Sequence, residues 1–332
     1  MMKPTLEKVK VGIVGCGYIG RTHAMAFSYT PKSEIVAVAD KDEQRAKELA
    51  SRYKAKPYTD YKTMIEKEDL DAVSIGLPSP LHAEASVYAL RHGLHVFCEK
   101  PMAHTLEECD MMIEEARKRS LNLMIGQSHR YWQLDREAKW IIDNGFIGEI
   151  ISLSNITMTG IPERWGDDIL MGTAVHFIDT IRWWAGSDVE TVYGKAGSYV
   201  SKWIDNASAI LTFKNGAFAS IEIYNTPGNR GQGFMRSHVF GTEGMLETDH
   251  YTELYLQKKG EQKVLLHSMG SGGFEGPNRV KTFSLETKEF IDSIIEGRDP
   301  AVPGEEGRKN IEIILAWVES SKTGKPVKLP LK

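Results

Sequence analysis

The chain has 332 residues, 41% of them hydrophobic and 26% charged, which suits a globular protein of two domains. Its net charge of −4 at pH 7 argues against a nucleic-acid partner, because nucleic-acid-binding proteins carry basic faces. No apolar run approaches the roughly 20 residues that span a bilayer, and the first residues lack the apolar segment of a signal peptide. The cysteines Cys16, Cys98 and Cys109 lack metal-ligand spacing and suit small buried residues in a reducing compartment. We therefore expect a cytoplasmic protein that binds neither nucleic acid nor membranes.

The first part of the chain alternates short apolar runs with helical patterns, which is typical of a parallel sheet covered on both faces. The runs predict strands at 9–14, 34–39, 72–77, 94–98 and 121–126. Helices are predicted between them at 18–28, 42–53, 80–92 and 105–119. This order indicates an α/β, doubly wound Rossmann domain, whose ligands bind outside the carboxyl ends of its strands.

The second part of the chain changes to longer strands with turn signals. After a bridging helix at 132–143, strands are predicted at 150–158, 190–200, 206–213, 217–224, 237–240, 245–248 and 253–257. Helices are predicted at 172–184, 282–296 and 305–321. We expect a Rossmann domain at 1–127, with the bridging helix reaching about 146, and an α+β domain with a largely antiparallel open sheet at 147–332. A return of the C-terminal tail to the first domain stays open.

One face of the sheet in the second domain needs a cover, either helices or another subunit. We expect a homo-oligomer, a dimer or a tetramer, that forms through this sheet.

A glycine string follows the first predicted strand with the spacing G-x-G-x-x-G, at Gly15, Gly17 and Gly20. Glycines let the backbone turn sharply, approach a pyrophosphate and pack a helix on a strand. The N–H groups of the next helix then face the phosphates. Such a string alone also fits an ordinary tight turn, but Asp40 lies twenty residues past the last glycine, where a ribose-binding carboxylate belongs.

Two residues are candidates for the chemistry. Lys100 follows a predicted strand and so falls on the ligand-binding edge, where a lysine can hydrogen-bond a substrate hydroxyl; most lysines, however, are solvated surface charges. His176 lies on the helix of the second domain with Asp179 one turn further on, on the same face. A neutral histidine oriented by a carboxylate suits removal of a proton from an alcohol, although a lone histidine is more often structural. Metal binding has little support, since neither H-E-x-x-H nor C-x-x-C occurs.

Together these features resemble the Gfo/Idh/MocA family of glucose–fructose oxidoreductases and inositol dehydrogenases. The matching segments are GCGYIG at 15–20, LPSPLHAE at 77–84, HVFCEKPMAHTLEE at 95–108, GQSHRYWQ at 126–133 and AVHFIDTIRWWAG at 174–186. The resemblance implies an NAD(P)-dependent oxidation or reduction of a hydroxyl on a sugar, a cyclitol or a related polyol. It makes Lys100 the catalytic lysine and His176 the acid/base residue.

The resemblance also implies where the ligands lie. The residues expected around the cofactor are Gly15, Gly17, Tyr18, Ile19, Gly20, Asp40, Lys41, Pro78, Ser79, His82, Glu99 and Lys100. Asp40 favours NAD because a carboxylate repels the 2′-phosphate of NADP, while Lys41 keeps NADP open. The residues expected near the substrate are Arg130, Trp165, Asp168, Gly172 and Asp179.

The chain departs from the family pattern at Gly172. Many members carry an aspartate four residues before the catalytic histidine. Asp168 replaces it only if the helix extends that far or the loop folds back, and Gly166-Asp167-Asp168 looks more like a helix start. Either a lysine–histidine pair suffices, or the pocket is roomier, or the redox chemistry is weakened. Two other functions therefore stay open: an NAD-retaining hydrolase or lyase that oxidises a glycoside transiently, and a non-catalytic NAD-bound sensor.

Overall fold

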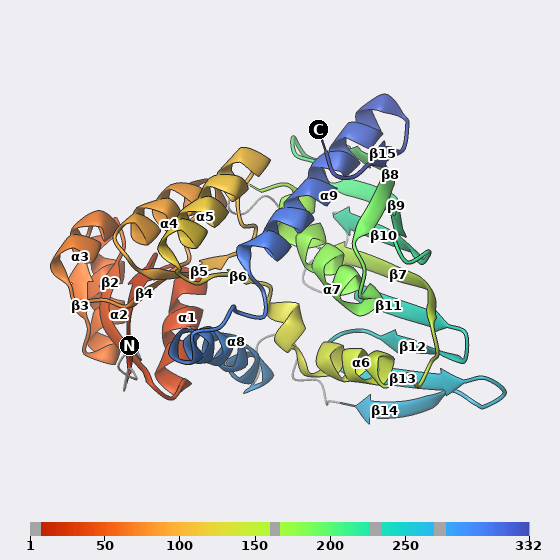
Figure 1. Ribbon diagram of the computed structural model, residues 1–332, viewed down its shortest axis with the longest axis horizontal. Coiled ribbons are helices and arrows are strands. Elements are labelled where there is room, and N and C mark those ends of the chain that lie inside the picture. The colour runs from red at the N-terminus through yellow and green to blue at the C-terminus, as the bar shows by residue number, and fades with distance from the viewer. Residues whose placement is uncertain (1–7, 160–166, 226–233, 269–276, 332) are drawn as a thin grey trace. The chain divides into compact units, whose positions relative to one another are not determined.

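The computed structural model describes residues 8–159, 167–225, 234–268 and 277–331 (Figure 1). The chain forms two compact units, Met1–Gln127 with Pro277–Arg308 and Ser128–Gly276 with Lys309–Lys332. Within the described ranges, none of the helices has the length and apolar character that crossing a membrane requires.

Unit 1 is built on a six-stranded parallel sheet with the order β3-β2-β1-β4-β5-β6. Its strands are β1 (Val9–Val14), β2 (Ser33–Ala39), β3 (Lys56–Tyr58), β4 (Ala72–Ile75), β5 (His95–Glu99) and β6 (Leu123–Gly126). Five of the six residues of β1 and all those of β4 and β6 are apolar or small and buried, as expected for strands covered on both faces. The predicted doubly wound domain is confirmed.

The helices of unit 1 cover both faces of this sheet (Figure 1). They are α1 (Tyr18–Tyr29), α2 (Glu43–Tyr53), α3 (Tyr61–Lys67), α4 (His82–Arg91), preceded by a 3₁₀ turn at Ser79–Leu81, and α5 (Leu106–Arg119). α5 starts with a capping box formed by Thr105 and Glu108. β3 and α3 are absent from the sequence prediction, because a three-residue strand containing Pro57 carries almost no periodic signal.

The structure places the end of the chain, whose possible return to the first domain the sequence analysis left open. The helix α8 (Pro277–Glu296) belongs to unit 1, while α6 (Gln133–Asp143), expected as a bridge, belongs to unit 2. Aromatic packing explains the return of α8. The ring of Phe290 lies 5.7 Å from that of Phe97 and 6.5 Å from that of Phe27, and all three side chains are fully buried.

Unit 2 is built on a nine-stranded sheet with the order β14-β13-β12-β11-β7-β10-β9-β8-β15. The strands are β7 (Ile150–Thr159), β8 (Val189–Gly197), β9 (Asn206–Phe213), β10 (Phe218–Asn225), β11 (Phe234–Gly241), β12 (Gly244–Thr248), β13 (Glu253–Lys258), β14 (Val264–Ser268) and β15 (Val327–Lys328). All neighbouring pairs are antiparallel except β7 and β10. The predicted α+β unit is confirmed.

One face of this sheet is covered by helices and the other is exposed. α6 and α7 (Val175–Ala185) lie along the covered face (Figure 1), and α9 (Gly304–Thr323) places Trp317 against Gly194 on β8. The alternation of buried and exposed residues in β9 follows from this. The large apolar side chains exposed on the outer face are Ile156, Tyr193, Ile210, Phe218, Phe234 and Phe240.

We expect Phe290→Ala to lower the free energy of unfolding by about 3–5 kcal/mol, because it leaves a cavity between α8 and the parallel sheet. Urea denaturation followed by circular dichroism measures the change. Tyr29→Ala is the control, because Tyr29 is 67% exposed, and its effect should stay within about 0.5 kcal/mol. Equal effects of the two substitutions would contradict the assigned role of α8.

Candidate active site

The glycine turn between β1 and α1 has the geometry of a phosphate cradle. Gly15 has a φ of +92°, and a Cβ at this position would lie 2.6 Å from the carbonyl oxygen of Gly76. A Cβ at Gly20 would lie 1.7 Å from the carbonyl oxygen of Gly15. A Cβ at Gly17 would meet no atom of the described residues within 4 Å. Two of the glycines therefore allow close backbone packing, and the third leaves open space at the start of α1, where the N–H groups of a helix bind anions.

Asp40 lies beside this turn, at the carboxyl end of β2. Its carboxylate accepts hydrogen bonds from the backbone N–H of Cys16 at 2.7 Å and of Asp42 at 2.9 Å. Each oxygen keeps a further lone pair for the hydroxyls of a ribose. Cys16 is fully buried within the turn, and burial, together with the negative charge of Asp40, raises the pKa of its thiol to about 12.

A residue that the sequence analysis missed contacts the first turn of α1. The guanidinium of Arg279, on α8, lies 4.2 Å from the centre of the Tyr18 ring, contacts the Tyr18 hydroxyl, and donates to the Thr22 hydroxyl at 2.8 Å. Sequence spacing gives no signal for this contact, because 257 residues separate Arg279 from Thr22. The structure thus brings a positive charge to the end of the unit where phosphates are expected.

The loop after β4 is tied to the loop after β5 by a buried histidine. The ring nitrogens of His82 lie 2.9 Å from the carbonyl oxygen of Leu77 and 2.8 Å from that of Pro101. Carbonyl oxygens only accept, so both contacts are hydrogen bonds when both ring nitrogens carry hydrogen. Ser79, in the same loop, lies 2.9 Å from Nε2 of His104. The predicted cofactor residues of the two loops are therefore neighbours.

Glu99, at the end of β5, is buried and held by two donors. His23 donates from Nε2 at 3.0 Å, and the backbone N–H of Lys100 donates at 3.0 Å. His23 in turn contacts the Ser74 hydroxyl through Nδ1 at 2.8 Å. Burial opposes ionisation of Glu99, but His23 and Lys100 hold its pKa below the usual value. A charged, buried carboxylate thus holds the backbone N–H of Lys100, on the ligand-binding edge of the sheet.

In unit 2, His176 lies in the first turn of α7, directly after one turn of π-helix at Leu170–Ala174. Asp168 caps this turn, since one oxygen accepts from the N–H groups of Leu170 and Met171 at 2.9 and 3.0 Å. The helix-start interpretation of Asp168 is confirmed. A Cβ at Gly172 would meet only the Cβ of Asp167, at 3.7 Å, among the described residues. Among the described residues, nothing therefore blocks a Cβ at Gly172.

Arg130 and Asp179, both expected near the substrate, pair with each other. Two guanidinium nitrogens of Arg130 donate to the two oxygens of Asp179 at 2.7 and 2.8 Å, and Asn310 donates to Asp179 at 2.9 Å. The carboxylate of Asp179 is fully buried. Asp179 is expected to orient His176. In the structure its carboxylate forms an ion pair that joins α7 to the 3₁₀ turn at Ser128–Tyr131. Trp165 lies outside the described residues.

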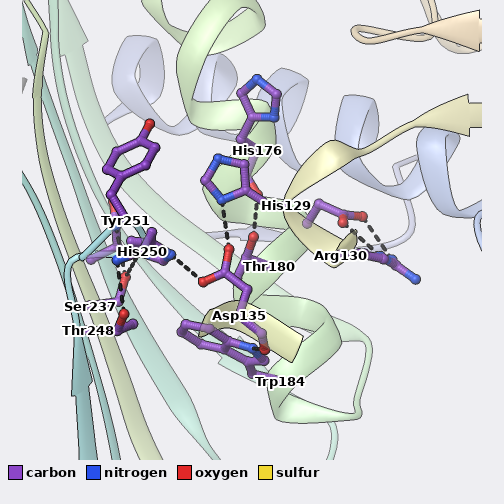
Figure 2. A network of polar contacts seen from close by, with 12 residues as sticks. His129, Arg130, Asp135, His176, Thr180, Trp184, Ser237, Thr248, His250 and Tyr251 are labelled. Carbon is purple, nitrogen blue, oxygen red and sulfur yellow. Dashed lines mark hydrogen bonds and ion pairs between the residues drawn. The ribbon is translucent and has the colours of Figure 1, made fainter. Parts of the chain in front are cut away.

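Next to His176 lies a buried network that the sequence analysis did not identify (Figure 2). The His129 ring lies 5.0 Å from the His176 ring, centre to centre. Asp135, on α6, lies between His129 and His250, with Nδ1 atoms at 3.0 and 2.6 Å from its oxygens. Asp135 and His250 are 115 residues apart in the sequence, and neither falls in a motif. The sequence analysis expected no metal site, yet these three residues hold donor atoms within 4.8 Å of one another.

The fold and the cradle in unit 1 define an oxidoreductase with an NAD-binding Rossmann domain. Residues 9–127 match the family model described as an oxidoreductase family with an NAD-binding Rossmann fold, and residues 139–329 match the model of its C-terminal alpha/beta domain. The chain belongs to the Gfo/Idh/MocA family, as the resemblance of its motifs predicted.

Similar proteins cover nearly the whole chain. Myo-inositol 2-dehydrogenase of Thermotoga maritima is 28% identical over 97% of this chain and 98% of its own length. Inositol 2-dehydrogenase of Salmonella typhimurium is 28% identical, with 98% of both chains covered. The crystal structure of a probable dehydrogenase from Thermotoga maritima has a TM-score of 0.84, 26% identity, and coverage of 97% of this chain and 99% of its own. A levoglucosan dehydrogenase in complex with NADH and levoglucosan has a TM-score of 0.87 at 23% identity, covering 98% of this chain and 100% of its own, and shows the shared fold.

We expect Asp40→Ser to weaken NADH binding about tenfold, because a charge-assisted hydrogen bond to the ribose is lost. The same change should strengthen NADPH binding, because the repulsion of a 2′-phosphate is removed. Fluorescence titration with each nucleotide measures both. Asp42→Ser is the matched control, since serine still caps α2. An unchanged preference between the two nucleotides in Asp40→Ser would contradict the assignment.

Proposed function

We propose that the chain oxidises or reduces a hydroxyl group of a sugar, a cyclitol or a related polyol, with NAD as the hydride carrier. The observation that carries the proposal is the fixed Glu99–Lys100 pair at the ligand-binding edge of an NAD-binding sheet. The names of the relatives support the substrate class, because two of them are inositol 2-dehydrogenases. NADP stays open through Lys41, next to Asp40.

Different residues of unit 1 would bind the different parts of NAD. The glycine turn, with Tyr18 and Ile19, would hold the pyrophosphate, and Asp40 the ribose. Pro78, Ser79 and His82 would line the path toward the nicotinamide, which Glu99 and Lys100 would flank. Bound NAD supplies the hydride acceptor or donor, so the protein has only to bind the substrate and move its proton.

Lys100 and His176 would have different roles toward the substrate hydroxyl. In the oxidation direction, Lys100 donates a hydrogen bond to the hydroxyl oxygen and stabilises the negative charge that develops on it. His176 takes the hydroxyl proton as the hydride leaves the same carbon. Five further residues stay predicted to lie near the substrate: Arg130, Trp165, Asp168, Gly172 and Asp179.

We expect Lys100→Met and His176→Asn each to lower kcat/KM by at least about a hundredfold, because each removes a group that acts on the reacting oxygen. NADH absorbance during a screen of sugars and cyclitols measures the rate, and fluorescence titration checks that NADH still binds. Oxidation by the unaltered protein should also slow as the pH falls, because a protonated histidine accepts no proton.

The matched controls are Lys62→Met and His92→Asn, which change an exposed lysine and an exposed histidine of unit 1. Both should keep full activity. Full activity in Lys100→Met and His176→Asn would refute the roles assigned to these residues. Turnover of a glycoside without net NADH formation would favour the transient-oxidation alternative, and NAD binding without turnover would favour the sensor.

We also propose that the outer face of the sheet in unit 2 joins two or more copies of this chain. The six exposed apolar side chains named above lie on the neighbouring strands β8–β9–β10–β7–β11, and apolar side chains gathered on an exposed surface are typical of an interface between proteins. Ile210→Glu should shift the mass measured by light scattering toward that of the monomer, because it places a charge in the interface between subunits. Glu222→Gln, on the same face, is the control. An unchanged mass in Ile210→Glu would contradict this surface.

A further inference from the structure

The hydrogen-bond chain behind His250 favours one of its ring nitrogens as the one that carries hydrogen (Figure 2). Thr157 donates to the amide oxygen of Asn155 at 3.1 Å, so the Asn155 amide nitrogen donates to the Ser237 hydroxyl at 2.9 Å. The hydroxyl of Ser237 keeps its own hydrogen for Nε2 of His250, which lies 2.8 Å away, and we take Ser237 as the donor of this contact. Nδ1 of His250 therefore carries the ring hydrogen and donates it to Asp135 at 2.6 Å. In this arrangement His250 is neutral.

The other oxygen of Asp135 orients His129 in the same way. A carboxylate accepts, so Nδ1 of His129 carries hydrogen and donates it at 3.0 Å. Burial lowers the pKa of His129, although Asp135 opposes this effect. Burial alone would raise the pKa of Asp135, but the two histidines bring it below its usual value. The group is thus an ionised carboxylate between two neutral rings, and it carries one negative charge.

A metal ion fits these atoms poorly. First-row metals hold nitrogen and oxygen ligands about 2.1 Å away in tetrahedral sites, which separates the ligand atoms by about 3.4 Å. The two contacts of Asp135, at 2.6 and 3.0 Å, are those of hydrogen bonds instead. Trp184 also packs parallel to the His250 ring and donates to the backbone oxygen of Asp135 at 3.1 Å. The geometry therefore favours a rigid hydrogen-bonded group.

We propose that Asp135 is a positioning residue for the dehydrogenase reaction: through His129 it fixes a neutral imidazole against His176, and its charge stabilises the imidazolium that His176 forms. This inference rests on the proposed function. The proton leaves the substrate hydroxyl for His176 as the hydride leaves for NAD, and neither His129 nor Asp135 gains or loses one. Asp135 would thus supply, from a different helix, the negative charge missing at Gly172.

The other charged and titratable groups around His129, among the described residues, support this assignment. Asp179, on α7, is neutralised by Arg130, which follows His129 in the same turn. Tyr251, after β12, stays neutral because burial raises its pKa far above the neutral range. His250 is neutral in the hydrogen-bond chain described above. The charge of Asp135 is therefore the one that a substitution can remove without breaking a salt bridge to an arginine or a lysine.

The test is the pH dependence of His176 in Asp135→Asn. Removing the negative charge disfavours the imidazolium, so the pKa of His176 should fall by about one pH unit. The acidic limb of kcat/KM then moves toward lower pH, and kcat at neutral pH drops about tenfold because the base is weaker. Asp135→Glu restores the charge and should return the limb close to its original position, even if kcat stays reduced.

Nuclear magnetic resonance of the full-length protein with ¹⁵N-labelled histidine tests the protonation of His129 and His176 without relying on activity. It should show His129 neutral with hydrogen on Nδ1, and a lower pKa of His176 in Asp135→Asn, with His176→Asn used to assign the signal. A charged His129, hydrogen on its Nε2, or an unmoved His176 pKa would overturn the inference. So would stoichiometric metal in the purified protein that disappears in Asp135→Asn.

Two controls separate the inference from other failures. Asp205→Asn removes another buried carboxylate of unit 2, one that accepts from the backbone N–H groups of Tyr199, Val200 and Ser201. It should lower stability without moving the limb; equal limb shifts in Asp205→Asn and Asp135→Asn would overturn the inference. If no polyol is oxidised but the resonance result holds, the proposed function fails and the histidine assignment stands. If polyols are oxidised and the limb stays in place, the inference alone fails.

Discussion

A buried carboxylate must find donors before it can stay ionised, and this requirement shapes both units of the chain. Glu99 meets it with His23 and the backbone of Lys100. Asp135 meets it with two histidines, and Asp179 with Arg130 and Asn310. In each case at least one donor lies 49 or more residues away in the sequence, so satisfying one charge holds separate segments together.

The same requirement bears on the two residues that we propose to act on the substrate. Lys100 is the residue after Glu99, and His176 lies against a ring that Asp135 orients. The backbone at Lys100 and the ring next to His176 are thereby held by buried carboxylates. Removing one partner of such a pair leaves the other buried and uncompensated, which costs more free energy than the pair itself contributes.

The sequence predicted what depends on local spacing. The glycine string, Asp40, and Lys100 at a strand end follow from a strand–turn–helix period, and the structure places the glycines and Asp40 side by side. What it did not predict depends on distant segments: Arg279 beside Tyr18, the return of α8, and the link from Asp135 to His250. The sequence around a lone histidine or aspartate in a polar helix does not indicate whether the side chain is exposed or buried. Only the tertiary packing distinguishes the exposed case from the buried one. Asp168 shows the intermediate case, since its capping role was readable from its position before a helix.

The thiol inside the glycine turn has a consequence for the chemistry of the whole chain. Thiols react with oxidants as thiolates, and the pKa of Cys16, like those of Cys98 and Cys109, is raised to about 12 by burial. At neutral pH almost none of the three is ionised, and all three are shielded from solvent. Peroxide or a disulfide in the surroundings therefore meets none of the three thiols in an exposed, ionised form, and the glycine turn holds a cysteine that resists oxidation.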